Sequence, residues 1–279
     1  MPKITIVTPS FNQGRFLEST MRSVLDQGYP HLEYMVMDGG STDGSVDVIR
    51  RYADRLAYWQ SSPDGGQAAA ILQGFQRATG DILAWVNSDD LLLPGCLQAV
   101  GEFFLRHPLE QCVVGGCLII DACGKPVLNR LGMPRVNPGH RLTFRQLLVG
   151  GYGFHQPATF WRRQAFFEVG GLDTALRFCM DMDLYLRLAR RRPLARMSDI
   201  LACFRQHQAS KTSTLRDVQR VENELSWRRY GKYDIPMLLR VLLKSLYSID
   251  NQLRNRLFLM KLWLGLAKMP RPAPDRDVS

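Results

Sequence analysis

Short apolar runs alternate with helical segments over the first hundred residues, and this alternation constrains the fold more than any other feature of the sequence. Residues 4–8 and 33–37 are short runs of mostly β-branched or apolar residues, which is typical of buried strands. Residues 15–27 and 67–78 place apolar side chains at helical spacing. Strands that alternate with helices form parallel sheets covered by helices. The sequence therefore predicts an α/β fold with a mostly parallel sheet and flanking helices.

The same pattern continues to about residue 212 and then changes. Further strands are expected at residues 56–60, 81–86, 111–120 and 157–161, and further helices at 43–52, 94–105, 163–170 and 181–192. Beyond residue 212 only helical patterns remain. We therefore expect a main domain over residues 1–212 and a helical tail over residues 213–279.

The tail carries most of the basic excess. The chain has 36 Lys and Arg against 26 Asp and Glu, and 15 of the former but only 7 of the latter lie in residues 204–279. Residues 236–268 are rich in leucine, and Arg240, Arg254, Lys261 and Lys268 differ by multiples of seven, so they share one helical face. This pattern suits an anionic membrane surface. Packing on the main domain or on a second subunit of a homo-oligomer remains an alternative.

The expected location is the cytoplasm, at the inner face of the plasma membrane if the tail binds lipid. The sequence shows no signal peptide and no uncharged apolar run of about 18 residues. The six cysteines show no paired spacing typical of zinc sites, so they are expected to be buried, reduced thiols.

Polar clusters follow three of the expected strands, at residues 8–12, 38–43 and 87–90. Ligands of parallel α/β sheets bind outside the carboxyl ends of the strands, so these clusters are expected to line one crevice. Adjacent carboxylates at Asp89 and Asp90 repel unless a cation offsets them, and a divalent ion held together with substrate phosphates would do so. The alternative is an acidic first turn of the helix that begins near Pro94.

Two common nucleotide-binding motifs are missing. No Gly-x-Gly-x-x-Gly follows the first strand, and no Gly-Lys-Ser or Gly-Lys-Thr phosphate loop occurs. This argues against a nicotinamide dehydrogenase and a P-loop NTPase.

The ordered set of motifs resembles family 2 glycosyltransferases with the GT-A fold. The similar segments are residues 4–12, 38–45, 64–74, 87–95, 170–173 and 181–188. The resemblance covers residues 1–212 and implies a Rossmann-like fold with a nucleotide-sugar half over about residues 1–95 and an acceptor half over about residues 96–212.

The resemblance also implies roles for the residues that meet the nucleotide. Those that match the family's nucleotide-binding positions are Pro9, Ser10, Asn12, Asp38, Asp64, Gln67 and Asp89. Pro9, Ser10 and Asn12 match the wall around the base, Asp38 matches the acid that binds it, and Asp89 lies nearer the ribose.

The family's metal motif implies that Asp90 binds a divalent metal ion, Mn²⁺ or Mg²⁺. Asn87 stands where the family often has Asp, and a neutral amide is a weaker ligand. His207 matches a segment in which related enzymes often carry a histidine near the metal or the diphosphate; a surface-loop histidine is the alternative.

Asp181 matches the catalytic base of the inverting members. A helix begins near it, so an ordinary N-terminal acid favoured by the helix dipole is the alternative. Contacts with the diphosphate, the donor sugar or the acceptor are expected from Arg205, Lys211, His155 and Asp173.

The resemblance implies transfer of a sugar from a nucleoside-diphosphate sugar to an acceptor hydroxyl, in bacterial surface polysaccharide or lipid-linked glycan synthesis. A UDP-sugar is favoured because a carboxylate at Asp38 suits uracil. The alternatives are a nucleotidyltransferase or another nucleotide-sugar-binding enzyme, and a non-enzymatic module that binds nucleic acid or membrane. Few aromatic residues lie among the basic residues of the tail, so nucleic acid is not an expected partner.

Overall fold

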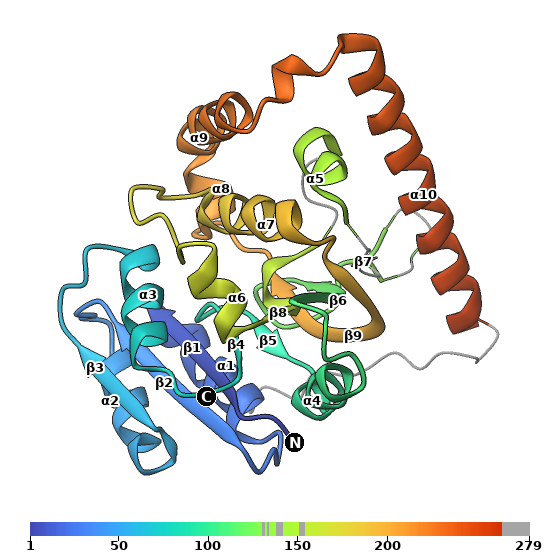
Figure 1. Cartoon of the computed structure of the whole chain (residues 1–279). Coiled ribbons are helices and arrows are strands. Elements are labelled where there is room, and N and C mark those ends of the chain that lie inside the picture. The colour runs from blue at the N-terminus through green and yellow to red at the C-terminus, as the bar shows by residue number, and fades with distance from the viewer. Residues whose placement is uncertain (130–131, 133, 138–141, 151–153, 264–279) are drawn as a thin grey trace.

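The computed structural model of the chain describes residues 1–129, 132, 134–137, 142–150 and 154–263. Within these residues one mixed sheet of nine strands runs in the order β3-β2-β1-β4-β8-β6-β9-β5, with β7 paired to β6 (Figure 1). The strands are β1 (Ile4–Ser10), β2 (Leu32–Asp38), β3 (Tyr58–Ser61), β4 (Ile82–Trp85), β5 (Leu91–Leu92), β6 (Cys112–Ile120), β7 (Val136–Asn137), β8 (Thr159–Arg162) and β9 (Ala195–Arg205).

The N-terminal half of the sheet is parallel and brings the polar strand ends together. Strands β1 to β4 pair in parallel, and Ser10, Asp38 and Ser61 lie in register at their carboxyl ends. All seven residues of β1 are buried, as in sheets covered on both faces. The predicted strands and their parallel arrangement are confirmed here.

The other half of the sheet is mixed. β8 runs antiparallel to both β4 and β6, whereas β9 runs parallel to β6 and antiparallel to β5. β9 is one of the long strands of the sheet but has no counterpart among the strands expected from the sequence. It matters for the site because it carries the chain past the end of β4.

Helices cover both faces of the sheet. They are α1 (Gly14–Leu25), α2 (Ser45–Arg51), α3 (Gln67–Arg77), α4 (Cys96–Arg106), α5 (Phe144–Gly150), α6 (Arg163–Glu168), α7 (Met180–Arg191), α8 (Lys211–Thr214), α9 (Arg216–Arg229) and α10 (Met237–Trp263), with short 3₁₀ turns at η1 (Ala53–Arg55), η2 (Gln156–Ala158) and η3 (Lys232–Asp234). One buried cluster joins α3 and α7 to one face, and another joins α1 and α4 to the opposite face. The GT-A-like layering expected from the sequence is therefore present.

The first tail helix is fixed to the main domain. In α9 and just after it, Arg229 contacts the carboxylates of Asp173 and Asp183 at 3.1 and 3.2 Å, and the Tyr230 hydroxyl donates to Asp183 at 2.6 Å. Tyr230 also belongs to the main hydrophobic core. We therefore propose that the main domain extends to about Ile235 rather than to residue 212.

The second tail helix stands away from this body. α10 contacts α5 but otherwise runs along the outside of the molecule (Figure 1). Of the basic face expected in the tail, Lys268 lies outside the described residues, and the side chains of Arg254 and Lys261 are not among those described. Among the helices of the described ranges, none has the length and apolar character needed to cross a membrane.

Candidate active site at the carboxyl ends of the strands

Asp38 ends β2 as a fully buried carboxylate. Its two oxygens accept hydrogen bonds from the Gly40 and Ser41 backbone N–H groups and from the Ser41 and Ser61 hydroxyls, over 2.6 to 3.1 Å. A carboxylate with four donors and no exposed surface organises the loop around it. The residue expected to bind the base therefore shapes the loop that follows β2.

Asn12 joins the loops that follow β1 and β2. The Asn12 backbone N–H donates to the Ser41 hydroxyl at 2.8 Å, and the Asn12 side chain accepts from the Thr42 N–H at 2.9 Å. Pro9 and Ser10 are buried beside this junction. The Ser10 hydroxyl is buried and has no hydrogen-bond partner within the described part of the chain.

Phe11 and Asp64 lie on either side of Gly39, at the mouth of the loops that follow β1 and β2. The Phe11 ring is 62% exposed. A Cβ atom at Gly39 would lie 3.0 Å from a carboxylate oxygen of Asp64 and 3.3 Å from the Phe11 ring, so these two side chains pack closely against a glycine that has no room for a side chain. An exposed ring beside a carboxylate is suited to a flat heterocycle that carries N–H donors. Sequence reasoning missed Phe11, although an aromatic residue at a strand end beside Asn12 was a visible signal.

The two adjacent acids after β4 differ sharply in their surroundings. The Asp90 carboxylate is 1% exposed and accepts the Arg205 backbone N–H at 3.0 Å and the Asn87 amide at 3.2 Å. Burial and the neighbouring charge of Asp89 raise the pKa of Asp90. Asp89 is partly exposed, and its Oδ2 lies 2.9 Å from His207 Nε2. Asp90 thus anchors the loop, while Asp89 and His207 face each other.

Arg205 holds the Asp89 loop in place. Its guanidinium donates to the backbone carbonyls of Asp89 at 2.8 Å and of Asp121 and Ala122 at 3.3 Å, and it lies over the Phe16 ring. The side chain is buried. These contacts place Arg205 beneath the loop rather than toward a diphosphate, and they explain how β9 brings His207 to Asp89.

The chemistry of this pair suits a divalent ion. Asp89 offers a carboxylate oxygen and His207 an imidazole nitrogen, and the two atoms already lie at 2.9 Å. Within the described ranges no group of three or more His, Cys, Asp or Glu side chains could hold a metal. Mn²⁺ and Mg²⁺ commonly complete their coordination with substrate phosphates and water. The residues therefore fit a metal that binds together with a phosphorylated substrate.

Polar bridges connect the acidic loop with α3 and with the segment that follows β9. The Gln67 amide donates to the Asn87 side chain at 2.6 Å, and the Lys211 ammonium donates to Gln67 at 2.5 Å and to the Arg177 carbonyl at 3.2 Å. The Asn87 amide in turn donates to Asp90. These bonds link residues that are up to 144 positions apart.

Asp181 lies in the first turn of α7. Burial and the charge of Arg177 lower the pKa of Lys211, whereas the charges of Asp181 and Asp64 act on it in the opposite direction. One ammonium therefore lies within electrostatic reach of acids from both halves of the domain. Of the acids expected in the site, Asp64 and Asp181 both act on Lys211.

The start of α7 is held by a carboxylate from the tail side. Glu222 of α9 is buried, and its oxygens accept the backbone N–H groups of Arg177, Phe178 and Cys179, each at 2.8 Å. These three N–H groups belong to the turn that leads into α7 at Met180, so the buried carboxylate satisfies donors that precede the helix. Glu222 thereby fixes the turn that carries Asp181.

Replacing Glu222 with glutamine should lower turnover while the KM for the donor stays unchanged, because the donor-side residues do not contact Glu222. The amide has one acceptor oxygen for three donors, and we expect the free energy of unfolding to fall by about 1–3 kcal/mol. Steady-state kinetics and thermal unfolding check both effects. Glu224→Gln, an exposed position on the same helix, is the matched control. Two results would contradict this role of Glu222. One is an equal loss of turnover in Glu222→Gln and Glu224→Gln, and the other is unchanged turnover in the folded Glu222→Gln enzyme.

Two of the expected contact residues are engaged elsewhere. His155 stacks on the Phe204 ring at 4.7 Å, and burial together with Arg135 lowers its pKa to about 4, so the ring is neutral near pH 7. Asp173 accepts the Ala175 N–H and pairs with Arg229. Both side chains are held by structural contacts of the fold.

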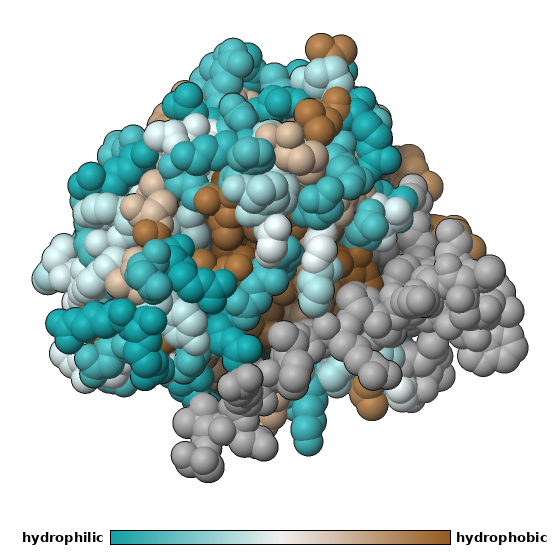
Figure 2. Space-filling model, turned by 90° about the horizontal axis from the view of Figure 1, so that it is seen from below, coloured by the Kyte–Doolittle hydropathy of each residue, from teal (hydrophilic) through white to brown (hydrophobic). Residues whose placement is uncertain are grey.

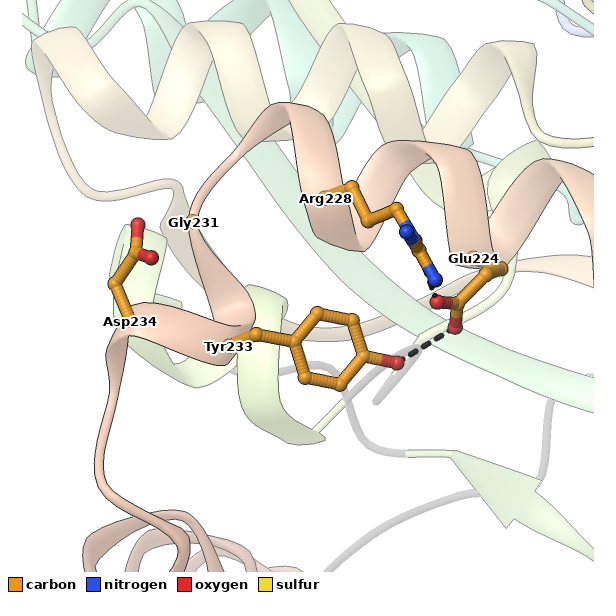
Figure 3. Close-up of a pocket in the computed structure, with 5 residues that line it drawn as sticks. All are labelled: Glu224, Arg228, Gly231, Tyr233 and Asp234. Atoms are coloured by element: carbon orange, nitrogen blue, oxygen red, sulfur yellow. Dashed lines mark hydrogen bonds and ion pairs between the residues drawn. The ribbon is translucent and has the colours of Figure 1, made fainter.

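A surface hollow on the tail lies apart from this site. It is lined by Glu224, Arg228, Gly231, Tyr233 and Asp234. Figure 3 shows Tyr233 and Arg228 both turned toward the Glu224 carboxylate, to which they donate at 2.6 and 2.9 Å. None of the site residues expected from the sequence lines it, so we assign the site to the strand ends.

Known proteins share both sequence and fold with this chain. Residues 5–170 match the family model described as Glycosyl transferase family 2. An uncharacterized glycosyltransferase of Mycobacterium tuberculosis (strain H37Rv) is 30% identical over 189 residues, which are 67% of this chain and 69% of the relative. The putative teichuronic acid biosynthesis glycosyltransferase TuaG of Bacillus subtilis is 34% identical over 121 residues, 42% of this chain and 48% of the relative.

Solved structures show the same fold at low sequence identity. Residues 1–349 of TarS from S. aureus, in complex with UDP-GlcNAc, match with a TM-score of 0.63 at 15% identity, covering 88% of this chain and 71% of that chain. The mannosyltransferase PcManGT from Pyrobaculum calidifontis, in complex with GDP-Man and Mn²⁺, matches with a TM-score of 0.60 at 17% identity, covering 96% and 81%. The GT-A-type fold expected from the sequence is confirmed.

Proposed function

The chain belongs to glycosyl transferase family 2 and is a glycosyltransferase, and from that premise we propose that it transfers a sugar from a UDP-sugar to an acceptor hydroxyl with inversion at the anomeric carbon. The observation that carries the proposal is the bridge from Asp90 through Asn87 and Gln67 to Lys211, because it joins the donor-side loops to the turn that bears Asp181.

The nucleobase is proposed to stack on the exposed Phe11 ring, beside the Asp64 carboxylate. Asp64 would accept an N–H of uracil, because the Asp38 oxygens already have four protein donors. Asp38 then acts through the loop whose shape it fixes. The UDP bound to TarS, a protein of the same fold, supports the choice of nucleotide.

The metal is proposed to be held by Asp89 and His207, with Asp90 as the anchor of the loop. The Asp90 oxygens are already engaged by Arg205 and Asn87, and this residue is almost without exposed surface. When bound, the ion would neutralise negative charge that grows on the leaving nucleoside diphosphate. The Mn²⁺ in the PcManGT structure supports metal dependence.

Asp181 is proposed as the general base of a single displacement. The acceptor oxygen forms a bond with the anomeric carbon as the bond from that carbon to the diphosphate oxygen breaks. Asp181 takes the hydroxyl proton, and the bonding pair leaves with the nucleoside diphosphate. One displacement inverts the anomeric configuration. The acceptor is proposed to be a bacterial surface glycan or its lipid-linked precursor, since TuaG is named for teichuronic acid biosynthesis.

Product analysis tests the proposed reaction against the rival of nucleotidyl transfer. We expect UDP-sugars to raise the thermal midpoint of the enzyme only when Mn²⁺ or Mg²⁺ is present, since a ligand at 100 times its Kd adds about 2.7 kcal/mol to the free energy of unfolding. Free UDP should then form only with an acceptor. Release of pyrophosphate would instead indicate nucleotidyl transfer, and stabilisation by GDP-sugars alone would exclude uracil as the base that stacks on Phe11.

A further inference from the structure

A long stripe of leucine side chains faces solvent along α10. The helix has 27 residues, which correspond to about 40 Å. Along it, apolar residues recur at intervals of three or four and so lie on one face. They are Leu238, Leu242, Leu246, Ile249, Leu253 and Leu257, and each is between 49% and 82% exposed. A continuous exposed apolar surface of this length marks an interaction site.

The stripe lies at the margin of the molecule, where another surface can reach it. Figure 1 shows α10 away from the sheet, with α5 as its neighbour. Figure 2 shows hydrophobic side chains at the edge of the face seen from below, on the side where α10 ends. Other hydrophobic side chains show near the centre of the same face (Figure 2). The stripe is distinguished by its regular spacing along one exposed helix.

Positive charge accompanies the stripe. The sequence of α10 has five basic residues and a single acid, Asp250. At its start, the Arg240 guanidinium lies 5.2 Å from the centre of the Tyr233 ring, and the Lys232 ammonium lies 3.3 Å from the centre of the Trp227 ring. Burial and the charges of Lys244 and Arg240 lower the pKa of Lys232, so three cations converge there. Whatever covers the stripe must also tolerate this charge.

The exposed leucines and the positive charge together decide which kind of partner can cover the stripe. A second copy would bury the leucines but would bring two helices with the same net positive charge together. An anionic bilayer accepts the apolar face at the acyl boundary and the cations at its headgroups. Spanning the bilayer does not fit, because no helix in the described ranges is long and apolar enough.

We propose that α10 lies in the plane of an anionic lipid bilayer, with the leucine stripe inserted and Arg240 and Lys244 at the headgroups. This docking does not depend on the reaction assigned to the strand-end site. It would hold the active site beside membrane-borne substrates.

Vesicle sedimentation of the full chain tests the proposal. The chain should bind vesicles that contain phosphatidylglycerol at least tenfold more tightly than vesicles of phosphatidylcholine alone, and added salt should weaken the binding. Leu246→Glu combined with Ile249→Glu should weaken it at least tenfold, because two inserted side chains become charged. Leu105→Glu combined with Leu109→Glu is the matched control, since both residues are exposed and lie outside α10. Unchanged circular dichroism melting confirms that each variant is folded.

Two results would overturn the proposal. One is equal binding to both vesicle types, or none to either. The other is a dimer in solution that the α10 double variant converts to a monomer while vesicle binding is unchanged, which would make the stripe a subunit interface. Sugar transfer to a soluble acceptor is measured in parallel, so that loss of docking and loss of activity are seen separately.

Discussion

Asp181→Asn should reduce transfer by a factor of about 10² to 10⁴, the usual contribution of general base catalysis, while donor binding stays at the wild-type level. Asparagine keeps the size of the side chain and its place in the first turn of α7, but it cannot take the acceptor proton. The donor-side contacts at Gly39, Asp64 and Asp89 do not involve residue 181. Initial rates of UDP release with acceptor, together with calorimetric titration of the donor, check both parts.

The control for this experiment is Asp47→Asn. Asp47 is an exposed acid of α2 that forms an ion pair with the exposed Arg50, so the turnover of this variant should match the wild type. Turnover of Asp181→Asn within a few-fold of the wild type would assign the proton transfer to another group. Loss of donor binding in the same variant would show that residue 181 contacts the donor instead.

Asp89→Asn should abolish metal-dependent donor binding, whereas Asp90→Asn should retain it and lose stability. Asp89 supplies the carboxylate that faces His207, so its loss removes a charged ligand. Asp90 accepts two hydrogen bonds in a buried site, and imperfect replacement of these by an amide costs about 1–3 kcal/mol. Calorimetric titration of a UDP-sugar with and without Mn²⁺, and thermal unfolding of each variant, separate the two effects.

The pair of variants decides between the two adjacent acids. If Asp90→Asn is stable but no longer binds the donor with Mn²⁺, and Asp89→Asn still does, then the metal ligand is Asp90, as the sequence motif alone implies. His207→Ala tests the same site independently. Like Asp89→Asn, this single variant should weaken the Mn²⁺ dependence of donor binding. If donor binding by His207→Ala keeps its normal Mn²⁺ dependence, then His207 is a hydrogen-bond partner of Asp89 and not a metal ligand.

The fold could be predicted from sequence wherever local pattern and tertiary environment agree. The strands β1, β2 and β6 are continuous apolar runs, and buried parallel strands require such runs. β9 was missed because Ser198 and Asp199 interrupt its apolar pattern, and its pairing with β6 shifts register near Gly116. Its strand structure depends on a partner that lies far away in the chain.

The candidate site could likewise be predicted from the sequence only in part. Polar residues at strand ends reveal where ligands bind, and this needs only the position of each strand. Which of Asp89 and Asp90 is buried cannot be read from neighbouring letters, because it depends on Arg205, which is more than a hundred positions away. The contact of Glu222 with the turn before α7 is likewise invisible in sequence, since an isolated Glu in a polar helix has no distinctive pattern.

That last contact limits how relatives of this enzyme can be recombined. A chimera joined near residue 212 would take the turn at Arg177 to Cys179 from one parent and its capping carboxylate from another. Hybrids with a junction after Asp234 would inherit both from the same source. A C-terminal segment exchanged into this chain should therefore begin at α10, so that the proposed membrane-docking helix changes while the turn before Asp181 keeps its native support.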